Sequence, residues 1–204
     1  MPTPENTAPD YLDLPLGEFL DRVASDSPAP GGGSVAAIAV ALAAGLAGMA
    51  ARLSTGQLSD APELADQADA SRHGVAPLAR ADAESYGRVL DAYRDPEDRT
   101  ARVRDALSGA ADVPLAVAEA GSEVAAIASR LVEQGNPNLK GDAMAAVLLA
   151  SAGVRAAAKL VQINLTSANV GDDRLNRANS LVDMTAATVR GGLRKETDER
   201  DKTL

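Results

Sequence analysis

The sequence contains no cysteine, no tryptophan and a single histidine, and its aromatic residues are Tyr11, Phe19, Tyr86 and Tyr93. A cysteine nucleophile, a disulfide scaffold and a thiolate zinc site are therefore excluded. A Ser-His-Asp triad or a histidine-rich metal centre could use only His73, so we predict no metal site. The platforms of stacked aromatics that hold single-stranded nucleic acid are also missing.

Residues that favour β-strands are scarce, whereas alanine, the best helix former, supplies 43 of the 204 residues. The composition predicts an all-α protein, and the length suits one domain built as a single helical bundle of about six to eight helices. Alanine brings helices close together but buries little area per residue. We therefore expect a second subunit to cover part of the bundle and predict a homodimer.

Positive charge is in short supply, because the net charge is −9 and the pI is about 4.6. This balance predicts binding neither to nucleic acid nor to a membrane, since both prefer a basic face. A local group of Lys or Arg could still bind a small anionic ligand. The first nine residues lack the basic and apolar segments of a signal peptide. Together with the missing cysteines, this predicts a cytoplasmic location.

The order of polar and apolar segments predicts a disordered tail over residues 1–10, a helical domain over 11–195 and a charged tail over 196–204. Pro77, with Gly74 before it, predicts a kink or break in a helical segment, and Pro114 predicts a second irregularity. The expected helices cover residues 12–24, 35–51, 60–94, 96–134, 140–164 and 175–190.

One of these segments, Val35–Ala51, has no polar side chain over seventeen residues. A transmembrane helix is one interpretation, but it needs about 20 strongly apolar residues, and more than half of this segment is Ala or Gly. We therefore predict a helix buried at the centre of the bundle. Ser34, directly before the segment, is the expected N-cap.

Three glycines, Gly31, Gly32 and Gly33, precede that helix and Ser34. Free backbone N–H groups and the positive end of the helix dipole could bind a carboxylate, a phosphate or a developing oxyanion there. No Gly-Lys-Ser/Thr sequence follows and no strand precedes, so it is neither a Walker loop nor a dinucleotide fingerprint. The alternative is a flexible turn in which the glycines adopt positive φ.

A second candidate is Asp82, which shares a helix face with Leu78, Ala79 and Tyr86. This spacing directs the carboxylate inward along an apolar stripe. A buried carboxylate has a shifted pKa and either a chemical role or a salt-bridge partner. The alternative is an ordinary surface aspartate.

A third group of polar residues, Asn136, Asn138, Lys140 and Asp142, lies at the start of the predicted helix over 140–164. These side chains could recognise a heterocycle with several donors and acceptors, and the alternative is helix capping by Asp142. Asn164 ends the same helix, where a buried amide needs a partner from the ligand or the backbone.

These segments, in this order on a helical chain, resemble the cyclodeaminase/cyclohydrolase family. That family includes the C-terminal domain of formiminotransferase-cyclodeaminase and stand-alone methenyltetrahydrofolate cyclohydrolases. The most specific part is Ser27–Ser34 running into the alanine-rich helix. The resemblance extends over about residues 14–175, and its other parts are Asp82 with Tyr86, Val113-Pro114-Leu115, Gly135–Asn138 with Asp142, and Ile163-Asn164-Leu165.

The resemblance implies a helical homodimer that binds a tetrahydrofolate derivative and acts at the C–N bonds between N5 and N10, as a cyclohydrolase or a cyclodeaminase. Asp82 and Asp142 would form the acid/base and electrostatic pair, with no metal or further cofactor. Residues expected to bind substrate are Gly31, Gly32, Gly33, Ser34, Tyr86, Asn136, Asn138, Lys140 and Asn164. The alternatives are a non-catalytic helical dimer that binds folate or a protein partner, and a plain helical scaffold.

Overall fold

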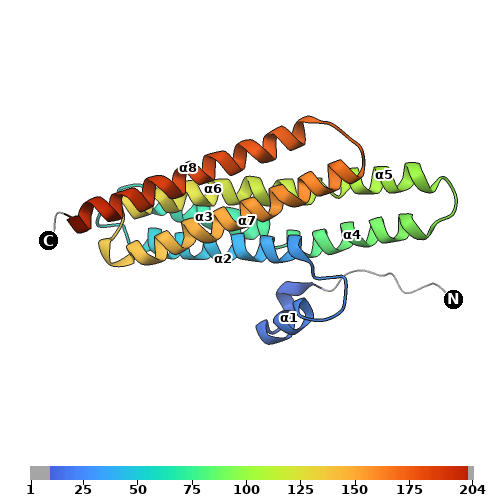
Figure 1. Ribbon diagram of the computed structural model, residues 1–204. Helices are drawn as coiled ribbons and strands as arrows, with labels where there is room; N and C mark the ends of the chain where they lie inside the picture. The colour runs from blue at the N-terminus through green and yellow to red at the C-terminus, as the bar shows by residue number, and fades with distance from the viewer. Residues whose placement is uncertain (1–9, 202–204) are drawn as a thin grey trace.

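The structure, a computed structural model, describes the backbone of residues 10–201 and the side chains up to Gly191. All of its elements are helices, and these residues form no β-strand. Figure 1 shows long helices running along one direction, with the short α1 set apart below them. The 3-10 helices are Tyr11–Asp13 and Pro137–Leu139, and the α-helices are α1 (Leu16–Val23), α2 (Gly32–Arg52), α3 (Ala61–Val75), α4 (Leu78–Arg94), α5 (Arg99–Gly109), α6 (Asp112–Gln134), α7 (Lys140–Ser167) and α8 (Asp173–Asp201).

The prediction of an all-helical bundle is confirmed, and so is the break at Pro77, which separates α3 from α4. The prediction at Pro114 was wrong in position. The chain breaks at Ala110–Ala111, and Pro114 lies buried in the first turn of α6, where the missing N–H has no intrahelical partner to lose. Helix α8 continues to Asp201, past the predicted end at residue 190 and into the predicted charged tail. Residues 1–9 lie outside the described residues, as do 202–204.

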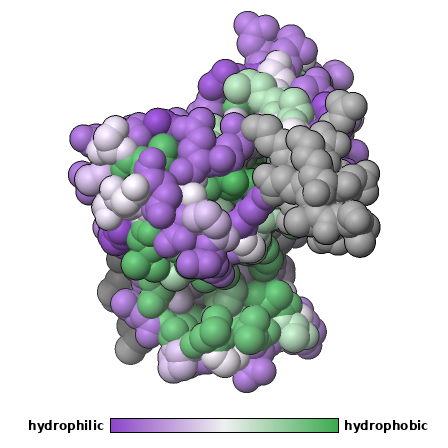
Figure 2. Space-filling model, turned by 90° about the vertical axis from the view of Figure 1, so that its left-hand side faces the viewer, coloured by the Kyte–Doolittle hydropathy of each residue, from purple (hydrophilic) through white to green (hydrophobic). Residues whose placement is uncertain are grey.

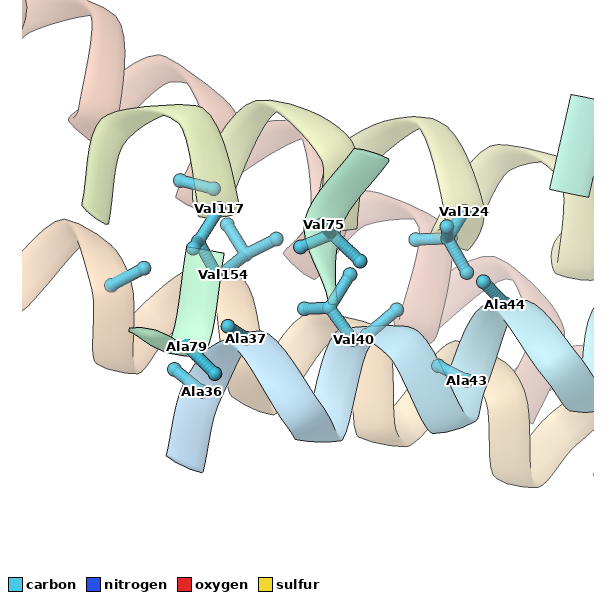
Figure 3. Packing of buried hydrophobic residues seen from close by; sticks show 14 of the residues in the cluster. Ala36, Ala37, Val40, Ala43, Ala44, Val75, Ala79, Val117, Val124 and Val154 are labelled. Atoms are coloured by element: carbon cyan, nitrogen blue, oxygen red, sulfur yellow. The ribbon is translucent and has the colours of Figure 1, made fainter. Parts of the chain in front are cut away.

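Helix α2 lies at the centre of the bundle, as predicted, and contacts α3, α4, α6 and α7. Figure 3 shows Val40 of α2 pointing into a cluster with Val75 and Val154. Two glycines make room for it: a Cβ at Gly153 would lie 2.5 Å from Val40 Cγ2, and a Cβ at Gly121 would lie 3.2 Å from the same atom. Small residues therefore let α6 and α7 approach α2 closely, which compensates for the scarcity of large side chains.

Two helical segments, Gly32–Arg52 and Pro137–Ser167, are long and apolar enough by composition to cross a membrane. In this fold, just over half of each segment's apolar window is buried against the rest of the bundle. Their hydropathy thus matches that of core helices, which is how the sequence was interpreted at Val35–Ala51.

The antiparallel arrangement of α2 and α7 defines the two ends of the bundle. At one end, the N-terminus of α2 lies beside the C-terminal part of α7, where Gly31–Gly33 and Asn164 line a common pocket. At the other end, Asn136 Nδ2 donates to Leu53 O, 3.0 Å away, which joins the C-terminus of α2 to the entry of α7. The predicted site residues are divided between these two ends.

Candidate active site

A pocket of about 300 Å³ lies at the end of the bundle where α2 begins and α7 ends. It is lined by the glycine-rich loop and by residues of α4, α5 and α7. The polar members that the sequence had singled out are Asp82, Tyr86 and Asn164. The apolar walls are formed by Pro28, Ala29, Ala83, Val89, Leu107, Ala110, Leu160 and Ile163.

The carboxylate of Asp82 caps α2 from a neighbouring helix. Ser34 N–H donates to Asp82 Oδ2 at 2.9 Å, and Ser34 Oγ lies 3.2 Å from the same oxygen. The shorter bond of the Ser34 hydroxyl goes to Ala79 O, 2.7 Å away on α4. Ser34 is therefore not the N-cap that the sequence predicted. Helix α2 begins earlier, with Gly31 as its N-cap, so Ser34 falls inside the first turn and ties α2 to α4.

The pKa of Asp82 is raised above its ordinary value, and burial is the main cause. The two hydrogen bonds from Ser34 lower this pKa and so offset part of the effect. Among the described residues, no basic side chain forms an ion pair with Asp82. The result is a carboxyl group that holds its proton to a higher pH than usual and has no fixed cation beside it.

Gly33 is required because the Asp82 carboxyl lies directly against its Cα. A Cβ at position 33 would stand 2.0 Å from Asp82 Oδ1, whereas Gly32 has open space and Gly31 only an ordinary contact. None of the described glycines has a positive φ, so the predicted use of glycine for backbone freedom was wrong at this loop. The peptide bond between Ala29 and Pro30, just before the glycines, is cis.

The other groups in the pocket have defined donor and acceptor roles. The N–H groups of Gly32 and Gly33, in the first turn of α2, have no hydrogen-bond partner within the described part of the chain. Asn164 donates its side-chain amide to Ala110 O at 2.8 Å, so its Oδ1 is the atom left to accept from a ligand. Tyr86 is about half exposed at the pocket wall, one turn from Asp82, as predicted.

The third predicted cluster lies at the opposite end of the bundle. Asp142 and Asn164 are both on α7, and their separation along the helix is roughly 33 Å at 1.5 Å per residue. Within one chain, therefore, Asp142 lies far from Asp82, and the structure does not bring the two predicted carboxylates together in a single-chain site. The spacing of these residues along the chain does not indicate which end of α7 faces the glycine-rich loop.

Asn136 organises that opposite end. Its backbone N–H donates to Ser54 Oγ at 2.9 Å, its side-chain nitrogen donates to Leu53 O, and its Oδ1 accepts from Asn138 N–H at 3.0 Å. All of these bonds join protein groups to each other. Lys140 and Asp142 are half-buried in the first turn of α7, and Asn138 is exposed.

A larger, more open groove of about 810 Å³ runs between α3 and α6. Alanine and glycine supply five of its eleven lining residues, including Ala70, Gly74, Ala116 and Ala120. It arises because small side chains fill little of the space between these helices, and it contains no cluster comparable with Asp82 and its partners. The described residues contain no group of three His, Asp or Glu side chains placed to hold a metal ion.

Several residues of the pocket were missed by sequence reasoning. Leu160 lies one helical turn before Asn164, so helical spacing from Asn164 could have found it. Ile163 directly precedes Asn164. Leu107 comes from α5, and no local pattern connects it to the glycine-rich loop. Tyr11 was also missed: its pKa is raised chiefly by burial, lowered by Arg22 and raised by Asp82, so its phenol lies within electrostatic reach of Asp82.

Comparison with known proteins decides the family. The sequence matches the formiminotransferase-cyclodeaminase family over residues 15–179. The chain belongs to this family. The resemblance carried by the glycine-rich loop and Asp82 is thereby confirmed.

Individual relatives agree with this assignment. Methenyltetrahydrofolate cyclohydrolase of Methylorubrum extorquens is 36% identical over 159 residues, which cover 72% of this chain and 76% of that protein. Formimidoyltransferase-cyclodeaminase of Rattus norvegicus is 32% identical over 76% of this chain, which spans only 31% of the rat protein. The crystal structure of formiminotetrahydrofolate cyclodeaminase from Thermotoga maritima matches with a TM-score of 0.75 and 30% identity, covering 89% of this chain and 92% of that one.

Proposed function

We propose that the protein is a tetrahydrofolate one-carbon enzyme that hydrolyses 5,10-methenyltetrahydrofolate to 10-formyltetrahydrofolate. The observation that carries the proposal is Asp82, a carboxyl group of raised pKa, held at the N-terminus of α2 and facing an apolar pocket. The similarity to a cyclohydrolase over most of the length of both chains supports this choice of reaction.

The reaction requires a carboxyl group more than it requires a nucleophilic side chain. The methenyl carbon joins N5 and N10 in an amidinium-like cation, and a nearby carboxylate stabilises such a charge. Water adds to this carbon and loses one proton, which gives a tetrahedral hydroxyl intermediate. The hydroxyl then loses its proton and becomes the formyl carbonyl as the carbon–N5 bond breaks and N5 takes up a proton, so one proton is released to solvent overall. Because Asp82 can accept a proton from water and return one to N5, a single residue serves both steps.

The remaining pocket groups suit a reduced pterin. The Asn164 Oδ1 accepts a hydrogen bond from a ring N–H or amino group, and the Gly32 and Gly33 N–H groups donate to a carbonyl or to the oxygen that develops at the reacting carbon. Tyr86 is the aromatic neighbour at the rim. No metal and no cofactor other than the folate substrate takes part in this scheme.

Formiminotetrahydrofolate cyclodeamination is the second candidate, favoured by the structural match to the Thermotoga maritima enzyme. In this reaction N10 attacks the protonated formimino carbon, the N10 proton passes to the leaving nitrogen, and ammonia departs. Asp82 would carry that proton. Both reactions pass through a tetrahedral carbon between two nitrogens, so the same pocket serves either.

We further propose a cytoplasmic homodimer as the working state. Large apolar side chains remain exposed on α1 and α2, which supports a partner subunit. A non-catalytic folate-binding dimer is the alternative, and it predicts binding without turnover.

The test is an assay of the purified protein with each substrate in turn, following the absorbance of the methenyl compound. We expect turnover of at least one compound above the uncatalysed rate, and a loss of about 10²- to 10⁴-fold in kcat for Asp82→Asn. Glu84→Gln is the matched control, because Glu84 lies on the same helix but pairs with Arg80. No acceleration of either reaction would overturn the proposal.

A further inference from the structure

The connection between α5 and α6 forms one wall of the pocket. We call residues 107–112 the α5–α6 corner. Leu107 and Ala110 of this corner line the pocket, and Ala110 O accepts the side-chain amide of Asn164 at 2.8 Å. The position of the corner therefore sets both the shape of the wall and the direction in which Asn164 Oδ1 points.

The corner depends on other helices for its shape. Helix α5 ends at Gly109, and the methyl side chain of Ala111, directly before α6, cannot accept a hydrogen bond from the N–H groups of the next turn. The backbone bonds from Ala110 N–H to Ala106 O and from Ala111 N–H to Ser108 O close the end of α5. Such local bonds do not fix the angle at which α6 departs, so that angle has to be set by contacts from outside the corner.

Arg174 of α8 supplies such a contact. Its Nη1 donates to Ser108 O at 2.8 Å and to Asp112 Oδ1 at 2.6 Å, and its Nη2 donates to Ser108 Oγ at 2.9 Å. The guanidinium thus binds groups on both sides of the turn at residues 109–111. Because its donors form a rigid planar fork, a guanidinium fixes the distance and the angle between the groups that it binds.

Arg174 is itself held in place by Asp172, the residue directly before α8. Its Nε donates to Asp172 Oδ2 at 3.0 Å, its Nη2 donates to the same oxygen at 2.6 Å, and its backbone N–H donates to Asp172 Oδ1 at 2.9 Å. The side-chain hydrogen bonds from Arg174 lower the pKa of the Asp172 carboxyl, so the pair stays charged. The side chain of Arg174 therefore reaches the corner in a fixed conformation.

Charged side chains are common on α8, and Arg174 differs from its neighbour Arg177 in burial. Figure 1 shows α8 along the top of the bundle, and Figure 2 shows mostly hydrophilic side chains at the top of the molecule. Arg177 pairs with Glu119 of α6 at 3.0 Å, and its side chain is 55% exposed. The side chain of Arg174 is only 24% exposed. Exposed ion pairs contribute little, whereas hydrogen bonds shielded from water contribute more, so Arg174 is the residue suited to fix the corner.

We propose that Arg174 is a positioning residue of the active site, which fixes the α5–α6 corner so that Ala110 O holds Asn164 with its Oδ1 toward the ligand. Arg174 does not line the pocket, so it acts through Ala110 and Asn164 and not on the substrate itself. The effect on substrate rests on the proposed function, whereas the effect on the corner does not.

Steady-state kinetics of Arg174→Ala test this role. We expect KM to rise about three- to tenfold, because the acceptor on Asn164 moves away from the ligand. The value of kcat should stay within about twofold, because Asp82 is held by Ser34 and not by the corner. Arg177→Ala is the matched control, since it also removes a bond from α8 to a carboxylate of α6, and it should change neither constant. An unchanged KM in Arg174→Ala would overturn the proposal, and so would a loss confined to kcat.

A double-mutant cycle separates positioning from a loss of stability. In an Asn164→Leu background, Arg174→Ala should raise KM no further, because the group through which Arg174 acts is already gone. Ser54→Ala removes a buried hydrogen bond at the opposite end of α2, so it should lower the melting temperature without a change in KM. Independent, multiplicative increases in KM would show that Arg174 acts by another route and would overturn the proposal.

Nuclear magnetic resonance tests the geometry without a substrate. The side-chain amide signals of Asn164, identified by their loss in Asn164→Leu, should shift in Arg174→Ala and stay in place in Arg177→Ala. The backbone N–H groups of Ala110 and Ala111 should exchange with solvent faster only in Arg174→Ala. Unchanged Asn164 signals in that variant would overturn the proposal. If the unaltered protein turns over neither folate, the proposed function fails, while these spectra still decide whether Arg174 positions Asn164.

Discussion

The two ends of α2 are built alike but differ in chemistry. Each end has a buried serine whose hydroxyl donates to a backbone oxygen at 2.7 Å: Ser34 to Ala79 O and Ser54 to Ala50 O. At the first end the serine also holds the carboxylate of Asp82, whose pKa burial raises. At the second end Ser54 Oγ accepts the N–H of Asn136, and the network joins protein groups only. A buried hydroxyl is therefore no indicator of a site; the ionisable group that it contacts is.

The largest difference between the ends should appear on adding one methyl group to the glycine-rich loop. Gly33→Ala places a Cβ 2.0 Å from Asp82 Oδ1, so the carboxyl must move, and a displacement of about 1 Å can cost 10²-fold in rate. We expect kcat to fall by about 100-fold, whereas Gly32→Ala, with open space around it, should retain activity. In an Asp82→Asn background Gly33→Ala should cost no further activity, and additive losses would show that Gly33 acts independently of Asp82.

A matched pair of serine substitutions compares the two ends directly. Ser34→Ala and Ser54→Ala each remove a buried hydrogen bond and should lower the free energy of unfolding by about 1–3 kcal/mol, measured by urea denaturation. Only Ser34→Ala should also move the pH–rate profile to higher pH, because Ser34 bonds lower the pKa of Asp82. An equal shift in both variants would contradict the distinction between the end of α2 that holds Asp82 and the end that only joins protein groups.

A smaller effect is expected at Asn164, which lies in the same pocket as Asp82 but already donates its side-chain amide to Ala110 O. Asn164→Leu removes the acceptor offered to the ligand and should raise KM by about tenfold, the value of a single hydrogen bond of about 1.4 kcal/mol, with little change in kcat. Gln162→Leu, on an exposed face two residues earlier, is the control. A change in kcat with constant KM would place Asn164 among the reacting groups.

The smallest effect is the pH dependence of stability that Asp82 causes. Its pKa is higher in the folded than in the unfolded state, so the folded protein binds the proton more strongly. This contribution is complete below the unfolded pKa of about 4 and is lost as the pH rises through the folded-state pKa. The melting temperature of the unaltered protein, relative to Asp82→Asn, should therefore decline across that window and then level off. A constant difference from pH 4 to pH 8 would contradict the raised pKa.

Local patterns in the sequence predicted the helices well because each depends on neighbouring residues. Proline and glycine marked the breaks at Pro77 and Gly135, and the uninterrupted apolar segment identified the central helix. Asp82 and Tyr86 were correctly placed on one face because they are one turn apart. The start of α2 was misjudged by three residues, so Ser34 lies inside the first turn and bonds α2 to α4 instead of capping the helix.

The pairing of distant segments was not accessible in this way. Asp82 and Asp142 are sixty residues apart, and nothing in their spacing reveals that the intervening helices carry them to opposite ends. The contact between Gly33 and Asp82 depends on how α2 and α4 cross, which composition does not specify. The family resemblance named these residues as one group without showing which of them meet within one chain.

The close contact of Val40 with Gly121 and Gly153 has a consequence for sequence variation in this fold. A methyl group gained at Gly153 has to be given up at Val40, whereas one gained at Gly121 meets Val154 Cγ2 first, at 2.7 Å. Gly153→Ala alone should be poorly tolerated, and Val40→Ala beside it should restore much of the loss. Residues 40 and 153 are therefore expected to change together, as a single inherited unit, even though they are 113 positions apart in the sequence.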